Sequence, residues 1–158
     1  MQPKITHLEK KKLVGMSCKM SFSQNKIKEL WQGFMPVVGH IQNRIGSDLY
    51  SAEIYDPAFF KQFDPDREFE KWAAVEVTDF DDVPDGMETF EFPGGLYAAF
   101  LHKGPASTAQ ITYQHIYREW IPNSEYSLDD KPHVAVMGES YNPTGQESAE
   151  QIWIPVKK

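Results

Sequence analysis

The chain repeats one pattern of residues at an offset of 86 positions. Residues 53–57 read Glu-Ile-Tyr-Asp-Pro, and residues 139–143 read Glu-Ser-Tyr-Asn-Pro. The same offset superposes large apolar residues at helical spacing, each set followed by a proline: Ile27, Leu30, Trp31, Phe34 and Pro36 onto Tyr113, Ile116, Tyr117, Trp120 and Pro122. Such a pattern indicates a duplicated unit, and the interface between two copies is a natural place for a ligand pocket.

Each copy reads as a β-α-β-β unit, the first over about 1–80 and the second over about 87–158. The strands expected from periodicity and turn residues are a short one around Ile5 and those at 13–20, 48–55, 69–78, 87–92, 96–102, 133–141 and 150–156. Helices are expected over 25–35 and from 107 or 108 to 120, with a loop at 121–132. The predicted fold is one α+β domain over 1–158. It has an antiparallel-rich sheet, two helices on one side and a pocket between the halves.

Charge and cysteine content limit the partners and the compartment. The formal net charge is −7, and the only basic cluster, Lys10–Lys12, reads as a solvated turn, so we expect no direct nucleic-acid binding. Cys18 is the single cysteine and cannot form an internal disulfide. The N-terminus lacks a signal peptide's apolar core, and no apolar run approaches the ~18 residues of a membrane span. A cytoplasmic protein without membrane contact is expected.

The sequence offers little for a metal or a cofactor. The five histidines show no paired ligand spacing. The sequence contains no P-loop, no G-x-G-x-x-G and no G-x-S-x-G motif. We therefore expect neither a metal nor a cofactor, and we assign no catalytic residue.

Carboxylates beside aromatic residues are the remaining chemical signal. Glu53, Glu76 and Glu139 lie in predicted strands that are otherwise mostly small or apolar. Each can face solvent on an uncovered sheet face, or lie at the mouth or floor of a cavity. A desolvated carboxylate needs hydrogen bonds or an opposite charge, which tyrosines or a cationic ligand would supply; it could instead act as a general base. The aromatic stripes of the helices likewise fit either core packing or pocket walls.

Four features in order carry a family resemblance. They are the duplicated β-α-β-β pattern, the strand Leu96–Phe100 followed by His-Lys-Gly, the helix end Tyr117–Pro122 and the closing Ile152–Val156. Together they resemble the gyrase-inhibitor-like (GyrI-like) small-molecule-binding domain, which is also the effector-binding domain of AraC- and MerR-type multidrug regulators. The resemblance covers essentially the whole chain.

The resemblance implies a two-repeat fold with a pocket between the halves. Relatives often bind lipophilic cations there, using aromatic walls and a buried glutamate. Some relatives stand alone, others are fused to a DNA-binding helix-turn-helix, and a few are hydrolases that use a glutamate and aromatic residues.

The resemblance carries over most directly to Trp120 and to the strand that contains Tyr97. For the pocket glutamate, Glu76 is the first choice and Glu139 the second. When the last strands of the two copies are aligned on Val77 and Val156, Pro155 corresponds to Glu76, so the two copies carry different residues at this position. The full predicted ligand-binding set is Glu53, Glu76, Glu139, Trp31, Phe34, Trp72, Tyr97, Tyr113, Tyr117, Trp120 and Trp153.

The leading hypothesis is a stand-alone module that binds an amphipathic, cationic aromatic small molecule. The net negative charge and the carboxylates among aromatic residues favour it. One alternative is a hydrolase that uses a pocket glutamate of raised pKa. Another is a protein-interaction module of the gyrase-inhibitor type, with a protein partner bound at an exposed apolar patch.

Overall fold

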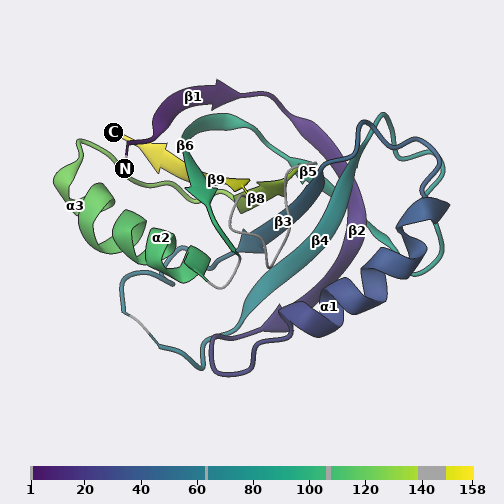
Figure 1. The fold of residues 1–158 in the computed structure, drawn as a ribbon, viewed down its shortest axis with the longest axis horizontal. Helices are drawn as coiled ribbons and strands as arrows, with labels where there is room; N and C mark the ends of the chain where they lie inside the picture. Colours follow the sequence, from purple (N-terminus) through teal and green to yellow (C-terminus); the bar gives the residue numbers. More distant parts are fainter. Residues whose placement is uncertain (1, 63, 106–107, 139–148) are drawn as a thin grey trace.

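The computed structural model of the 158-residue chain describes residues 2–62, 64–105, 108–138 and 149–158 (Figure 1). The first half contains β1 (Lys4–Leu8), β2 (Lys11–Met20), α1 (Ile27–Phe34), the 3₁₀-helix η1 (Met35–His40), β3 (Leu49–Ile54) and β4 (Phe69–Val77). The second half contains β5 (Glu88–Phe92), β6 (Gly95–Lys103), α2 (Ala109–His115), the π-helical segment η3 (Ile116–Trp120), α3 (Ile121–Asn123), β7 (Ser127–Leu128), β8 (His133–Met137) and β9 (Ala149–Lys157).

The strands form one strongly curled antiparallel sheet (Figure 1). Its order within the described residues is β1-β6-β9-β8-β3-β4-β2-β5, and β7 pairs with β9. Strand β3 of the first half pairs with β8 of the second half, so the two halves meet at the centre of the sheet. The expected α+β fold with an antiparallel sheet is confirmed.

The halves also exchange their leading strands. β1 pairs with β6 of the second half, and β5 pairs with β2 of the first half. At the crossing, Gly94 adopts a φ of 70°, and a Cβ there would collide with the backbone of Leu8 and Glu9. The sequence analysis did not foresee this exchange, because the residue pattern of a strand does not specify its partner strand.

The two faces of the sheet are buried by different residues. The concave face is filled by aromatic and aliphatic side chains of the strands alone, among them Trp72, Tyr97 and Trp153. The opposite face is covered by the helices: Leu30 and Phe34 of α1 pack on β2 and β4, and Ile116 of η3 packs on β6 and β9. Both helical segments therefore lie on one side of the sheet, as predicted.

The structure differs from the expected elements at several places. The 3₁₀-helix η1 extends past Pro36 to His40, and β2 begins at Lys11, within the basic tract expected to be a turn. The single helix expected over 107–120 is divided into α2 and η3, and α3 continues to Asn123 because a proline is tolerated in the first turn of a helix. The loop expected at 121–132 contains β7, which pairs with the end of β9. The strand expected at 133–141 is described only as far as Met137, and the second copy of the Glu-x-Tyr-Asx-Pro pattern lies outside the described residues.

The contact between β2 and β4 predicts a severe effect of adding one methyl group. A Cβ at Gly15 would collide with the carbonyl oxygen of Ala73 and the Cα of Ala74 on the neighbouring strand. Gly15→Ala should therefore lower the free energy of unfolding by about 1–3 kcal/mol or more, measured by urea denaturation. Gly33→Ala is the matched control, because open space surrounds Gly33 and alanine favours a helix by roughly 0.5–1 kcal/mol over glycine. Equal stability of Gly15→Ala and wild type would contradict the prediction.

Candidate ligand-binding site

Charged and polar side chains gather on the helix-covered face of the sheet. Because side chains alternate along a strand, Lys71 shares this face with Ala73 of β4, and Glu150 shares it with Ile152 of β9. The residues of this polar cluster are Glu53, Lys71, His102, His133 and Glu150. Of these, Lys71, His102 and His133 are each 4% exposed and Glu150 is 9% exposed. Such groups are rarely buried unless they are paired, so their concentration marks this face.

Glu53 and Lys71 form a short, buried ion pair. The two residues are opposite each other on β3 and β4, and Lys71 Nζ lies 2.6 Å from Glu53 Oε1. Their side chains are only 13% and 5% exposed. On the other neighbouring strand, Glu53 is opposite His133. Removing one partner of a buried pair costs about 3–5 kcal/mol, because the remaining charge is left uncompensated.

Glu150 is the second carboxylate of the polar cluster. It is opposite His102 on β6, whose ring nitrogen Nδ1 lies 2.7 Å from Thr112 Oγ1 of α2. Burial raises the pKa of Glu150 above its ordinary value, while the charges of His102 and Lys71 oppose the rise and Glu53 adds to it. Among the described residues, Glu150 forms no salt bridge. Its negative charge is therefore only partly compensated.

Aromatic side chains border the polar cluster at Glu53. The Tyr117 hydroxyl lies 2.9 Å from His133 Nδ1, and the Tyr55 ring meets the His133 ring edge to face at 4.9 Å. Burial raises the pKa of both tyrosines, and the charge of Glu53 adds to the rise. Burial lowers the pKa of His133 to about 3, so this imidazole is neutral near pH 7.

Phe60 lies over this aromatic group from the segment between β3 and β4. Its ring stacks on Tyr117 at 5.1 Å and on His133 at 5.5 Å. The side chain is nevertheless 41% exposed. Tyr113 extends the aromatic group, since its ring stacks on Tyr117 at 6.4 Å. These rings offer flat apolar surfaces with polar edges close to a carboxylate.

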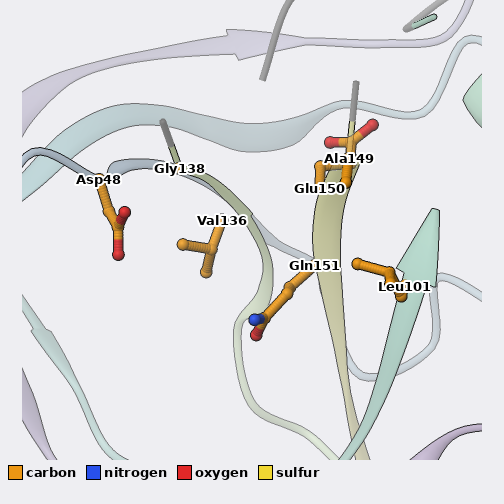
Figure 2. A pocket seen from close by; sticks show the side chains of 7 residues that line it. All are labelled: Asp48, Leu101, Val136, Gly138, Ala149, Glu150 and Gln151. Carbon is orange, nitrogen blue, oxygen red and sulfur yellow. The ribbon is translucent and has the colours of Figure 1, made fainter. Parts of the chain in front are cut away.

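Two cavities lie near the polar cluster. The larger, of about 390 Å³, is lined by Tyr55, Phe60 and His133, with charged residues of both signs at its rim. The smaller, of about 140 Å³, lies where β8 ends and β9 begins, and Figure 2 shows Glu150 and Gln151 among its lining residues together with Val136 of the concave core. The larger cavity reaches the aromatic end of the polar cluster, and the smaller one reaches Glu150.

The structure divides the sequence-predicted binding residues among several places. Trp72, Tyr97 and Trp153 lie in the concave core, and Trp31 and Phe34 lie under α1. Tyr113 of α2 and Tyr117 and Trp120 of η3 pack between these helices and the sheet. Glu139 lies outside the described residues. Of the predicted residues that the structure describes, Glu53, Tyr113 and Tyr117 come together at the polar cluster. A contact between a ligand and any of the predicted residues stays a prediction.

Glu76, the first choice from the sequence, lies on the concave side of the sheet. Its carboxylate is 3.5 Å from Lys11 Nζ and accepts a hydrogen bond of 3.4 Å from the Tyr50 hydroxyl. The sequence alignment that made Pro155 the counterpart of Glu76 is wrong. In the antiparallel ladders, Glu76 pairs with Leu13 in the first half. Adding the repeat offset of 86 residues to Leu13 gives Ala99, which pairs with Trp153 in the second half. The strand register therefore makes Trp153 the counterpart of Glu76.

Sequence reasoning missed six members of the candidate site: Tyr55, Phe60, Lys71, His102, His133 and Glu150. The signal was the alternation of side chains along the strands. Glu150 is two residues before Ile152, which packs beneath η3. Lys71 is two residues before Ala73, which packs under α1. A polar residue that is two positions along a strand from a helix-facing residue points to the same face and is expected to be buried there.

The described residues include no helix long and apolar enough to cross a membrane. In the same part of the chain, no group of three or more His, Cys, Asp or Glu side chains is arranged to hold a metal ion.

Comparison with known proteins places this site in a family context. The model of the GyrI-like small-molecule-binding domain matches residues 1–157. The transcriptional regulator BrlR of Pseudomonas aeruginosa is 30% identical over 149 residues, which cover 91% of this chain and 51% of BrlR. The chain thus spans about half the length of this curated relative.

Two solved structures share the fold. SAV2435 bound to tetraphenylphosphonium superposes with a TM-score of 0.80 at 17% identity, covering 99% of this chain and 94% of SAV2435. The EcmrR C-terminal domain superposes with a TM-score of 0.72 at 16% identity, covering 99% and 98%. With the family match over nearly every residue, the chain belongs to the GyrI-like small-molecule-binding domain family.

Proposed function

We propose that the chain binds an amphipathic organic cation on the helix-covered face of the sheet. The aromatic group formed by Tyr55, Phe60, Tyr113, Tyr117 and His133 would contact the apolar part of the ligand. Glu53 and Glu150 would attract its positive charge. The observation that carries this proposal is that two carboxylates, the largely buried Glu53 and the buried Glu150, lie on this face with one buried lysine, which is paired directly with Glu53.

The charges of the polar cluster favour a cation. Lys71 compensates Glu53 directly at 2.6 Å, whereas Glu150 is opposite His102 and forms no salt bridge among the described residues. His133 adds no positive charge near pH 7, because burial lowers its pKa to about 3. An ionised Glu150 therefore leaves an excess negative charge in surroundings of low polarity, where opposite charges attract more strongly than in water.

The size and chemistry of the larger cavity suit the apolar part of such a ligand. Its volume of about 390 Å³ lies within the range of small-molecule sites. The exposed faces of aromatic rings attract cations as well as apolar groups. The complex of SAV2435 with tetraphenylphosphonium, a bulky aromatic cation, supports this ligand class for a protein of the same fold.

A role as the effector-sensing part of a transcriptional response is a further part of the proposal. It rests on the similarity to the regulator BrlR, of which this chain spans about half. The hydrolase and the gyrase-inhibitor-type alternatives stay predictions. A hydrolase would turn over an ester in the presence of Glu150 and lose that activity in Glu150→Gln.

Removal of the uncompensated carboxylate should weaken cation binding. We expect Glu150→Gln to lower the affinity for tetraphenylphosphonium by about tenfold or more in isothermal titration calorimetry, because an isosteric amide cannot attract the cation. Glu91→Gln is the matched control, since Glu91 is an exposed carboxylate on the edge strand β5, which β2 separates from β4 and the polar cluster. Glu76→Gln tests the first choice from the sequence.

The outcomes separate the competing assignments. Loss of affinity in Glu76→Gln together with wild-type affinity in Glu150→Gln would place the charge contact on the concave side and contradict the proposed site. Absence of heat of binding for tetraphenylphosphonium and other aromatic cations with the wild type would contradict the proposed function.

The raised pKa of Glu150 predicts a pH-dependent affinity. Tetraphenylphosphonium has a fixed charge, so only protein groups titrate. Affinity should be constant at high pH and should fall as the pH decreases through the raised pKa of Glu150, where the carboxyl becomes neutral. His133 remains neutral down to about pH 3 and does not contribute near neutral pH. Titrations at decreasing pH, continued to the acid limit at which the fold stays intact, should show this decrease in the wild type and a flatter profile in Glu150→Gln.

A further inference from the structure

Lys71 is an unusual residue to find buried on the face of the sheet that is proposed to bind a cation. It is only 4% exposed and lies on the same face as the two carboxylates, within a strand of small and apolar residues. Its ammonium group is held 2.6 Å from Glu53 Oε1. A buried lysine opposes the binding of any cation, so its presence must limit which cations the site accepts.

The position of Lys71 makes its charge effective across the site. It is opposite Glu53, and Glu53 is opposite His133 at the aromatic end of the polar cluster. Small side chains, Ser51 and Ala135, continue the same face of β3 and β8 toward the Glu150 end. The charges of Lys71 and Glu53 both act on the pKa of Glu150, so the three groups belong to one electrostatic unit.

Resting on the proposed function, we propose that Lys71 is a specificity-determining residue that restricts the site to singly charged cations. With Glu53 neutralised by its ion pair at 2.6 Å, Glu150 alone remains to meet the ligand, and one negative charge matches one positive charge. A dication would bring a second positive charge into a buried site that already holds the Lys71 ammonium. That charge would lack a partner and would carry a full desolvation cost.

Ethidium and propidium are suitable probes, because they share one flat aromatic ring system and differ by an additional quaternary ammonium group. Their affinities are measured by calorimetry at pH 8. The wild type should bind ethidium at least about tenfold more tightly than propidium. Tetraphenylphosphonium serves as a second singly charged probe.

Three variants change the charge of the site in steps. Glu53→Gln leaves Lys71 and Glu150 to balance each other and should weaken binding of ethidium by about tenfold or more. Lys71→Met leaves two negative charges and should shift the preference from ethidium toward propidium by a similar factor. The double variant Glu53→Gln/Lys71→Met leaves one negative charge again and should recover wild-type affinity for ethidium and the wild-type preference.

Recovery in the double variant distinguishes charge from structure. Lys71→Met alone leaves Glu53 buried without its partner and can destabilise the fold, so circular dichroism melts accompany each titration. Glu53→Gln keeps a hydrogen-bond acceptor for Lys71, and the double variant removes both charges together. If Lys71 only holds the strands together, the double variant will bind ethidium no better than Glu53→Gln. That result, or equal affinity of the wild type for ethidium and propidium, overturns the inference.

Failure of the proposed function gives a different result. In that case the wild type binds neither ethidium nor tetraphenylphosphonium, whatever the state of Lys71. If the wild type binds ethidium and tetraphenylphosphonium but binds propidium equally well, the proposed cation site stands and only the role of Lys71 is rejected.

Discussion

The antiparallel pairing of β3 with β8 is the contact on which the rest of the structure depends. These two strands join the halves at the centre of the sheet, and their register sets Glu53 opposite His133. Strand β4 then adds Lys71 on the other side of Glu53. A shift of this register by one residue would turn Glu53 to the concave side and bring Ala52 to the helix-covered face. The ion pair and its contact with the aromatic group therefore follow from one main-chain ladder.

Much of the fold could be predicted because strand and helix patterns are local. The apolar run of β2 and the helical stripe of α1 identify their own segments. The exchange of β1 and β5 could not be predicted, because their short alternating sequences fit either half. The site was harder for a related reason: Glu76 and Glu150 look alike in sequence, and only the strand register places Glu76 beside Tyr50 and Glu150 beside His102.

The two halves differ at the position that the proposed site uses. His102 is opposite Glu150 in the second half. The 86-residue offset carries His102 back to Met16, and Met16 is opposite Ala73 in the first half. The first half therefore has an apolar pair that packs beneath α1, whereas the second has a polar pair beneath α2. Of these two positions related by the 86-residue offset, the one in the first half packs in the core, and the one in the second half carries polar groups of the proposed site.

The exchange of leading strands makes the halves mechanically interlocked. Pulling them apart requires breaking the β3–β8 ladder and, in addition, the ladders of β1 with β6 and of β5 with β2. The halves should accordingly unfold as one cooperative unit. Rigid-body opening of one half relative to the other would break these ladders. A ligand of the proposed site would therefore have to reach the polar cluster past the side chains that cover it, such as Phe60 stacked on Tyr117, while the sheet itself stays closed.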